Sequence, residues 1–113
     1  MNKFFFVLLS ILLVGCATPE LYHWGSYENT LYKSFKEGGS FTVEEQIDLL
    51  QKDIDTAQSK ELKVAPGVFA QLGYLYFQVG DNSAAKNAFQ TESRLFPESK
   101  KFMDRLISKI NIQ

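Results

Sequence analysis

Residues 66–99 read PGVFAQLGYLYFQVGDNSAAKNAFQTESRLFPES, and their pattern decides the fold class. Apolar residues recur every three or four positions in two runs, as on the buried faces of two helices. Pro66 suits the first helical position, where its missing N–H would be unpaired anyway, and Gly80 suits the end of the first run. Asp81 or Asn82 can cap the second run, which stops before Pro97. The expected buried side chains are Phe69, Leu72, Leu75, Tyr76, Val79, Ala85, Ala88 and Phe89.

The same stretch resembles one tetratricopeptide repeat, because it has that family's length of 34 residues and its pattern. Gly73 and Ala85 are small where two antiparallel helices would cross closely, and Tyr76 and Phe89 fill the space beside the crossing. Glu92 replaces the small residue usual in the family, which suggests looser packing or an exposed face there. A generic helical hairpin is the alternative, since it would bury nearly the same residues. The matching positions are Phe69, Leu72, Gly73, Tyr76, Ala85, Phe89 and Pro97.

Further helices are expected on both sides of this stretch. Residues 42–45 (TVEE) match the capping box, so a helix should begin there and run to about Ser59. A helix at about 24–37 follows from the spacing of its apolar residues, and a last helix at 98–111 resembles the helix that caps such repeat arrays. The sequence therefore predicts an all-α domain over residues 24–113, made of tetratricopeptide-like antiparallel hairpins with a C-terminal capping helix. The buried faces of the two flanking helices should hold Ile47, Leu50, Ile54 and Ala57, and Phe102, Met103, Leu106, Ile107 and Ile110.

The N-terminal residues have the layout of an export signal. Lys3 is followed by an apolar run to Val14 and then by small residues, which predicts a signal peptide over residues 1–15. As a helix the run would reach only about 16 Å, against roughly 30 Å of hydrocarbon core, so a permanent span is not expected. Residues 13–16 (LVGC) resemble the lipobox of bacterial lipoproteins. The resemblance implies that Cys16 carries acyl chains. It also implies that Ala17, in place of the Asp of an inner-membrane retention signal, leaves the outer membrane as the destination, on its periplasmic face. Residues 16–23 are then a lipidated tether.

Composition excludes several classes of function. The chain has 12 Lys and Arg against 13 Asp and Glu, whereas nucleic-acid binders are usually strongly basic. Cys16 is the only cysteine and His23 the only histidine, and the sequence has no Gly-rich phosphate loop, metal-spaced cluster or nucleophile–base pair. We therefore expect no nucleic-acid partner, no cofactor, no metal and no enzymatic activity.

A second resemblance covers nearly the whole chain. Residues 22–27 (YHWGSY), Leu31-Tyr32, Pro66-Gly67 and Leu72-Gly73 resemble an uncharacterised family of small bacterial lipoproteins that open with a Tyr-x-Trp-Gly-x-Tyr motif. Members of this family tend to occur beside a lipoprotein similar to the curli-secretion pore protein. The resemblance implies an envelope complex that contains both proteins.

Two groups of residues are candidates for partner binding. On a tetratricopeptide hairpin the inward positions of the first helix line a groove, and here they are Ala70, Gln71, Tyr74, Phe77 and Gln78. Exposed aromatic residues on such a surface are typical binding anchors. The alternative is that the next helix covers them. Trp24 and Tyr27, with Tyr22 and Tyr32, lie close to the anchor and can contact lipid headgroups or a partner, unless the first helix packs them on the core.

The expected function is that of an outer-membrane-anchored adaptor that binds another envelope protein. A pilotin or assembly chaperone for a secretin or pore subunit is one alternative, and a self-associating structural lipoprotein is another. Self-association is considered because two hairpins and a cap are fewer than the three repeats that stable arrays usually need.

Overall fold

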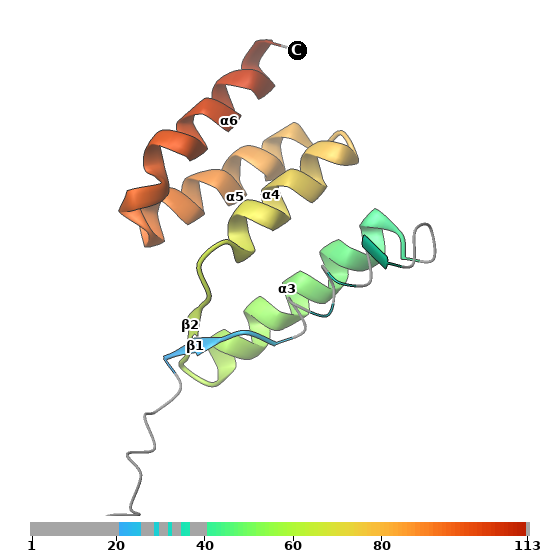
Figure 1. Cartoon of the computed structure of the whole chain (residues 1–113), viewed down its shortest axis with the longest axis vertical. Helices are drawn as coiled ribbons and strands as arrows, with labels where there is room; N and C mark the ends of the chain where they lie inside the picture. The colour runs from blue at the N-terminus through green and yellow to red at the C-terminus, as the bar shows by residue number, and fades with distance from the viewer. Residues whose placement is uncertain (1–20, 26–28, 30–31, 33–34, 37–40, 113) are drawn as a thin grey trace, which may run out of the picture.

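The computed structural model describes residues 21–25, 29, 32, 35–36 and 41–112. The expected signal peptide, Cys16 and Tyr27 lie outside the described residues. Helices dominate the described part, as expected for an all-α domain, and Figure 1 shows α3, the pair α4 and α5, and α6 stacked in that order. Asn29, Tyr32, Phe35 and Lys36 are helical as well. The elements are β1 (Tyr22–His23), α3 (Val43–Ser59), β2 (Lys63–Val64), α4 (Val68–Gln78), α5 (Asn82–Leu95), the 3-10 helix η1 (Pro97–Ser99) and α6 (Lys100–Ile112).

Helix α3 begins at the capping box that the sequence predicts. The Thr42 hydroxyl accepts a hydrogen bond from the Glu45 N–H at 3.1 Å, and the Glu45 carboxylate accepts one from the Thr42 N–H at 2.9 Å. Two N–H groups that no helical carbonyl could reach are thereby paired. Leu50, Ile54 and Ala57 are buried, and Ile47 is half-buried beside them. The predicted bounds and buried face of this helix are confirmed.

Residues 22 and 23 are part of the fold, which corrects the expected extent of the tether. Strand β1 pairs in parallel with β2, with Tyr22 opposite Lys63 and His23 opposite Val64. Strands of two residues are too short to produce a periodic pattern in the sequence, which explains why the pattern did not indicate them. Gly25 then turns the chain against α3 with φ of 50°, and a Cβ atom there would lie 2.6 Å from the Asp53 carboxylate. Trp24 is not helical, so the first helix does not begin at residue 24.

Helices α4 and α5 form a hairpin, and its crossing is as close as expected. A Cβ atom on Gly73 would lie 2.6 Å from the Phe89 ring and 3.1 Å from the Ala85 carbonyl oxygen. Ala85 is itself fully buried. The small residues therefore let the two helix backbones approach, while Phe89 fills the adjacent space.

The ends of these two helices differ from the expectation in detail. Pro66 does not open α4, because Gly67 with φ of 91° precedes the first helical residue, Val68. Val79 is the C-terminal cap of α4 and is 42% exposed, so it does not belong to the buried face. Helix α5 begins as expected, with the Asp81 carboxylate accepting a hydrogen bond from the Ala84 N–H at 3.0 Å.

The core consists of two clusters that meet at the hairpin. One lies between α3, β2 and α4 and is centred on Leu50 and Leu75, while the other lies between α5 and α6 and is centred on Phe89 and Met103. Tyr76 packs against both clusters. Phe102 was expected on the buried side of the last helix but is 59% exposed. The buried residues of α6 are Met103 and Ile110. The last helix is also shorter at its start than expected, since residues 97–99 form η1.

Candidate functional site

The row of side chains predicted to bind a partner lies on one side of α4. Tyr74 is 52% exposed, Gln78 is exposed, and Gln71 and Phe77 are half-buried. The Gln78 side-chain amide donates a hydrogen bond to the Tyr74 hydroxyl at 3.4 Å. The structure therefore brings these four residues together, and the next helix along the chain leaves Tyr74 accessible.

An apolar hollow of about 310 Å³ lies between α4 and α6. We call it the α4–α6 hollow. Phe89 of α5 contributes to it, and Lys109 is the one charged residue in its wall. Its volume is at the lower limit for small-molecule sites and suits one or two apolar side chains of a protein partner. The full lining is Tyr74, Phe77, Phe89, Leu106, Lys109 and Ile110.

A second hollow of about 340 Å³ lies on the other side of Tyr74, between α4 and α3. Gln71 and Gln78 supply amide groups that can pair with the backbone of an extended segment, whereas the amide of the buried Gln46 donates to the Phe41 carbonyl oxygen at 3.4 Å. Phe35, which is 86% exposed, and Val43, Tyr74 and Leu75 complete the lining. Tyr74 therefore lines both hollows, the apolar one towards α6 and the more polar one towards α3.

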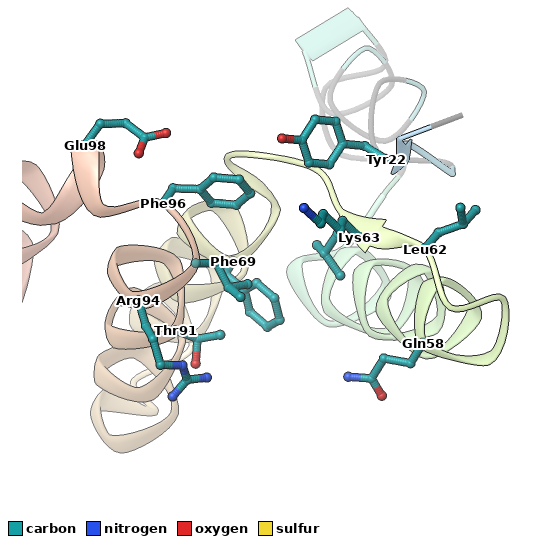
Figure 2. Close-up of a pocket in the computed structure, with 11 residues that line it drawn as sticks. Tyr22, Gln58, Leu62, Lys63, Phe69, Thr91, Arg94, Phe96 and Glu98 are labelled. Atoms are coloured by element: carbon teal, nitrogen blue, oxygen red, sulfur yellow. The ribbon is translucent and has the colours of Figure 1, made fainter. Parts of the chain in front are cut away.

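A larger hollow, of about 690 Å³, lies elsewhere, between β1, β2 and the end of α5. Figure 2 shows the rings of Tyr22, Phe69 and Phe96 in this cleft, with Lys63 between the Tyr22 and Phe69 sides and Arg94 below. Glu98 is the one carboxylate among the lining residues. Among the described residues neither Lys63 nor Arg94 has an ion-pair partner.

Glu92 is buried at the start of α4, which corrects the expectation of loose packing or exposure. It is 3% exposed, and its Oε1 accepts a hydrogen bond from the Gly67 N–H at 2.7 Å. Burial raises the pKa of this carboxyl, while the nearby backbone N–H groups of Gly67, Ala70 and Phe69 partly offset the rise. A carboxylate from α5 therefore takes the role of an N-terminal cap for α4, where the helix itself has no side-chain cap.

The aromatic residues near the N-terminus form a short chain of contacts. The Tyr22 ring lies 6.3 Å from Trp24, nearly perpendicular to it, and also 6.3 Å from Phe96. Trp24 is 44% exposed and Tyr32 is 59% exposed, so neither is packed in the core. Tyr22 instead fixes the N-terminal segment to the end of α5.

Groups that could hold a metal ion are absent from the part of the chain that the structure describes. Within the same residues, no helix has the length and apolar character needed to cross a membrane.

Sequence reasoning identified the α4 side of the site but missed its other walls. Leu106 and Ile110 were assigned to the core, although they also line the α4–α6 hollow. The cleft at Tyr22 was missed because it depends on the pairing of β1 with β2, whose paired residues are 41 positions apart in the chain (63 − 22). The sequence did hold one signal for the unusual role of Glu92, namely that an acidic residue occupies a position where the repeat pattern usually has a small one.

The fold and its hollows define a small helical domain with an open, partly apolar side. A family model described as "Domain of unknown function (DUF4810)" matches residues 21–106, and the chain belongs to this family. The expectation of an uncharacterised family is thereby confirmed. A segment of 60 residues, 53% of the chain, is 33% identical to part of the phosphoglucosamine mutase of Bdellovibrio bacteriovorus. The match spans only 13% of that enzyme's length. No solved structure matches the chain.

Proposed function

We propose that this protein is a lipid-anchored adaptor of the bacterial envelope, which binds a segment of another envelope protein on the open side of α4. The observation that carries the proposal is Tyr74, a large aromatic residue left 52% exposed between two hollows. Tyrosine is enriched among residues that dominate binding energy, because it offers apolar area and a polar tip. Binding rather than catalysis is the proposed activity.

The two hollows together suit an extended or helical peptide segment. An apolar side chain of the partner enters the α4–α6 hollow beside Phe77 and Leu106. The backbone of the partner pairs with the amides of Gln71 and Gln78 on the other side of Tyr74. This is the use that tetratricopeptide-like hairpins make of the first helix of each pair. The close crossing of Gly73 with Phe89 and Ala85 supports the assignment of α4 and α5 to that type of hairpin.

Acyl chains on Cys16 are proposed to hold the protein at the periplasmic face of the outer membrane. Several buried acyl chains give practically irreversible anchoring, since each CH₂ contributes about 0.8 kcal/mol. The first candidate partner is a lipoprotein similar to the curli-secretion pore protein, which the family resemblance implies. Both proteins would then be held at the same membrane, which raises their effective concentration.

Crosslinking in intact cells tests this proposal. A photoreactive residue at Gln78, which is exposed beside Tyr74, should capture the pore-like lipoprotein. Tyr74→Ala should lower the yield about tenfold, because loss of a binding anchor costs 1–2 kcal/mol or more. Gln90→Ala, at an exposed position on α5, is the matched control and should leave the yield unchanged.

Other outcomes of the same experiment would contradict the adaptor proposal. Crosslinks between two copies of this chain would support a self-associating structural lipoprotein instead. Loss of the pore protein from the outer membrane on deletion of this chain, without crosslinks in the assembled pore, would support a pilotin or assembly chaperone. If labelled palmitate is not incorporated, or is incorporated equally in a Cys16→Ser variant, the proposed acyl anchor on Cys16 is contradicted.

A further inference from the structure

We propose that one edge of the domain docks on the surface of an anionic lipid bilayer. This edge, which we call the β1 edge, consists of β1 with the flanking residues Leu21 and Trp24, β2 with the connection from α3, the end of α5 and the start of α6. Figure 1 shows these segments on the same side of the molecule, where β1 begins. The inference rests on the proposed lipid anchor for its biological setting, but its physical basis is the charge and exposure of the edge itself.

Cations are concentrated at the β1 edge. Lys63 and Arg94 line the cleft with Tyr22, Lys60 is the C-terminal cap of α3, and Lys100 and Lys101 open α6. The carboxylates in these segments are Glu61, the buried Glu92, Glu98 and Asp104, the last of which pairs with Lys100 at 2.6 Å, so that five cations face four carboxylates. The edge is therefore net positive, although the whole chain has a formal charge of −1. Each Lys or Arg near an anionic membrane surface adds to the attraction.

Exposed apolar side chains accompany these cations. Leu21 is 59% exposed, Trp24 44%, Leu95 46% and Phe102 59%, and all four belong to the segments of the β1 edge. Leu95 lines the same cleft as Lys63 and Arg94, and Trp24 contacts the Tyr22 ring. Tryptophan and tyrosine favour the headgroup layer, where one end of the ring is apolar and the other is hydrated. Basic residues interleaved with exposed aromatic ones are typical of surfaces that lie on a bilayer.

The opposite edge has a different character. It contains the start of α3 and the α4–α5 connection, where the ionisable residues are Glu44, Glu45 and Asp81. These carboxylates, although accompanied by Lys36 ahead of α3 and Lys86 in the second turn of α5, make this edge less attractive to anionic lipid than the β1 edge, so charge favours one orientation of the domain.

The position of the anchor also points to the β1 edge. Tyr22 lies six positions after Cys16, and six fully extended residues span about 20 Å at most. Tyr22 is held in place by its pairing with Lys63 and its contact with Phe96. An anchored molecule therefore presents its β1 edge to the bilayer, whereas Lys109 and Ile110 in the α4–α6 hollow lie near the far end of α6. Docking in this orientation leaves the proposed partner site accessible.

The single tryptophan of the chain makes the proposal directly testable. The mature Cys16→Ser chain, which lacks an acyl anchor, is mixed with vesicles of phosphatidylethanolamine and phosphatidylglycerol that contain brominated lipid. We expect the bromine atoms to quench Trp24 fluorescence, and high salt to reverse the quenching. Lys63→Gln with Arg94→Gln should weaken the vesicle affinity roughly 25-fold, at about fivefold for each cation removed. Lys52→Gln with Lys86→Gln, on α3 and α5, is the matched control and should leave the affinity within about twofold.

Two results would overturn the inference. One is equal affinity for these vesicles and for vesicles of phosphatidylcholine alone. The other is vesicle binding that the control pair weakens as much as the Lys63 and Arg94 pair does. Because Cys16→Ser removes the anchor, both results are independent of whether Cys16 is acylated in cells. Palmitate labelling of the unaltered chain tests that separate point.

Discussion

Glu92 shows how a single side chain joins two helices. Its carboxylate comes from α5, and its Oε1 pairs with the Gly67 N–H at the start of α4. Among the described residues its Oε2 is buried without a hydrogen-bond partner. An ionised carboxylate in this place is stabilised by the helix N-terminus and destabilised by loss of water, and the raised pKa shows that the loss of water is the larger effect.

The pH dependence of stability follows from this balance. In the unfolded chain the carboxyl titrates near its ordinary value of 4.5, and in the folded chain it titrates at higher pH. The folded state therefore binds more protons between the two values, so the contribution of Glu92 to the free energy of unfolding falls as pH rises above 4.5. We expect Glu92→Gln to remove this decline while its amide oxygen still accepts from Gly67. Urea unfolding of both proteins across this pH range is the measurement, and parallel profiles would contradict the argument.

Glu92→Ala separates the hydrogen bond from the charge. It leaves the Gly67 N–H without its acceptor, which should cost about 1–3 kcal/mol at pH 4.5 and less as pH rises in the same urea titrations. A cost confined to neutral pH would instead assign the role of Glu92 to charge alone.

The close pairing of α4 and α5 depends on the absence of a side chain at Gly73. A Cβ atom at Gly73 would lie 2.6 Å from the Phe89 ring, so Gly73→Ala should force the helices apart and cost about 1–3 kcal/mol in urea unfolding. Phe89→Leu alone should also destabilise the domain, because it leaves a cavity in the second core cluster. In the double variant the smaller Leu makes room for the methyl group. We expect its cost to be below the sum of the two single costs by at least about 0.5 kcal/mol, and strict additivity would count against the close crossing.

The elements that the sequence predicts are those with local signals. The capping box at Thr42, the Asp81 cap and the Gly73 crossing each follow from residues close in the chain or from one repeat pattern. The features that escaped prediction depend on distant partners. Tyr22 forms part of a strand through its pairing with Lys63. Glu92 is buried where its carboxylate accepts from the Gly67 N–H, at a helix start that has no side-chain cap of its own. The exposure of Tyr74 likewise depends on where α6 lies, which periodicity along the chain does not specify.

At the scale of the whole molecule, two core clusters share the α4–α5 hairpin. A stacked array whose units contact only their neighbours can unfold from one end, whereas a small domain usually unfolds in a single transition. Tyr76 packs against both clusters, and Phe96 at the end of α5 contacts Tyr22 of β1. These contacts link the last helix to the N-terminal segment. We infer from them that the described domain unfolds as one unit.

Met103→Ala tests this inference from the far end of the molecule. Met103 is 2% exposed between α5 and α6, so its truncation should cost about 2–5 kcal/mol, a large part of the stability of a small domain. If unfolding is a single transition, far-ultraviolet circular dichroism and Trp24 fluorescence should shift to the same lower urea midpoint, because Trp24 reports on the β1 edge through Tyr22. Leu50→Ala, in the other cluster, should shift both signals together as well. A Trp24 transition that stays in place while the helical signal falls early would mean that α6 unfolds separately from the remainder of the domain.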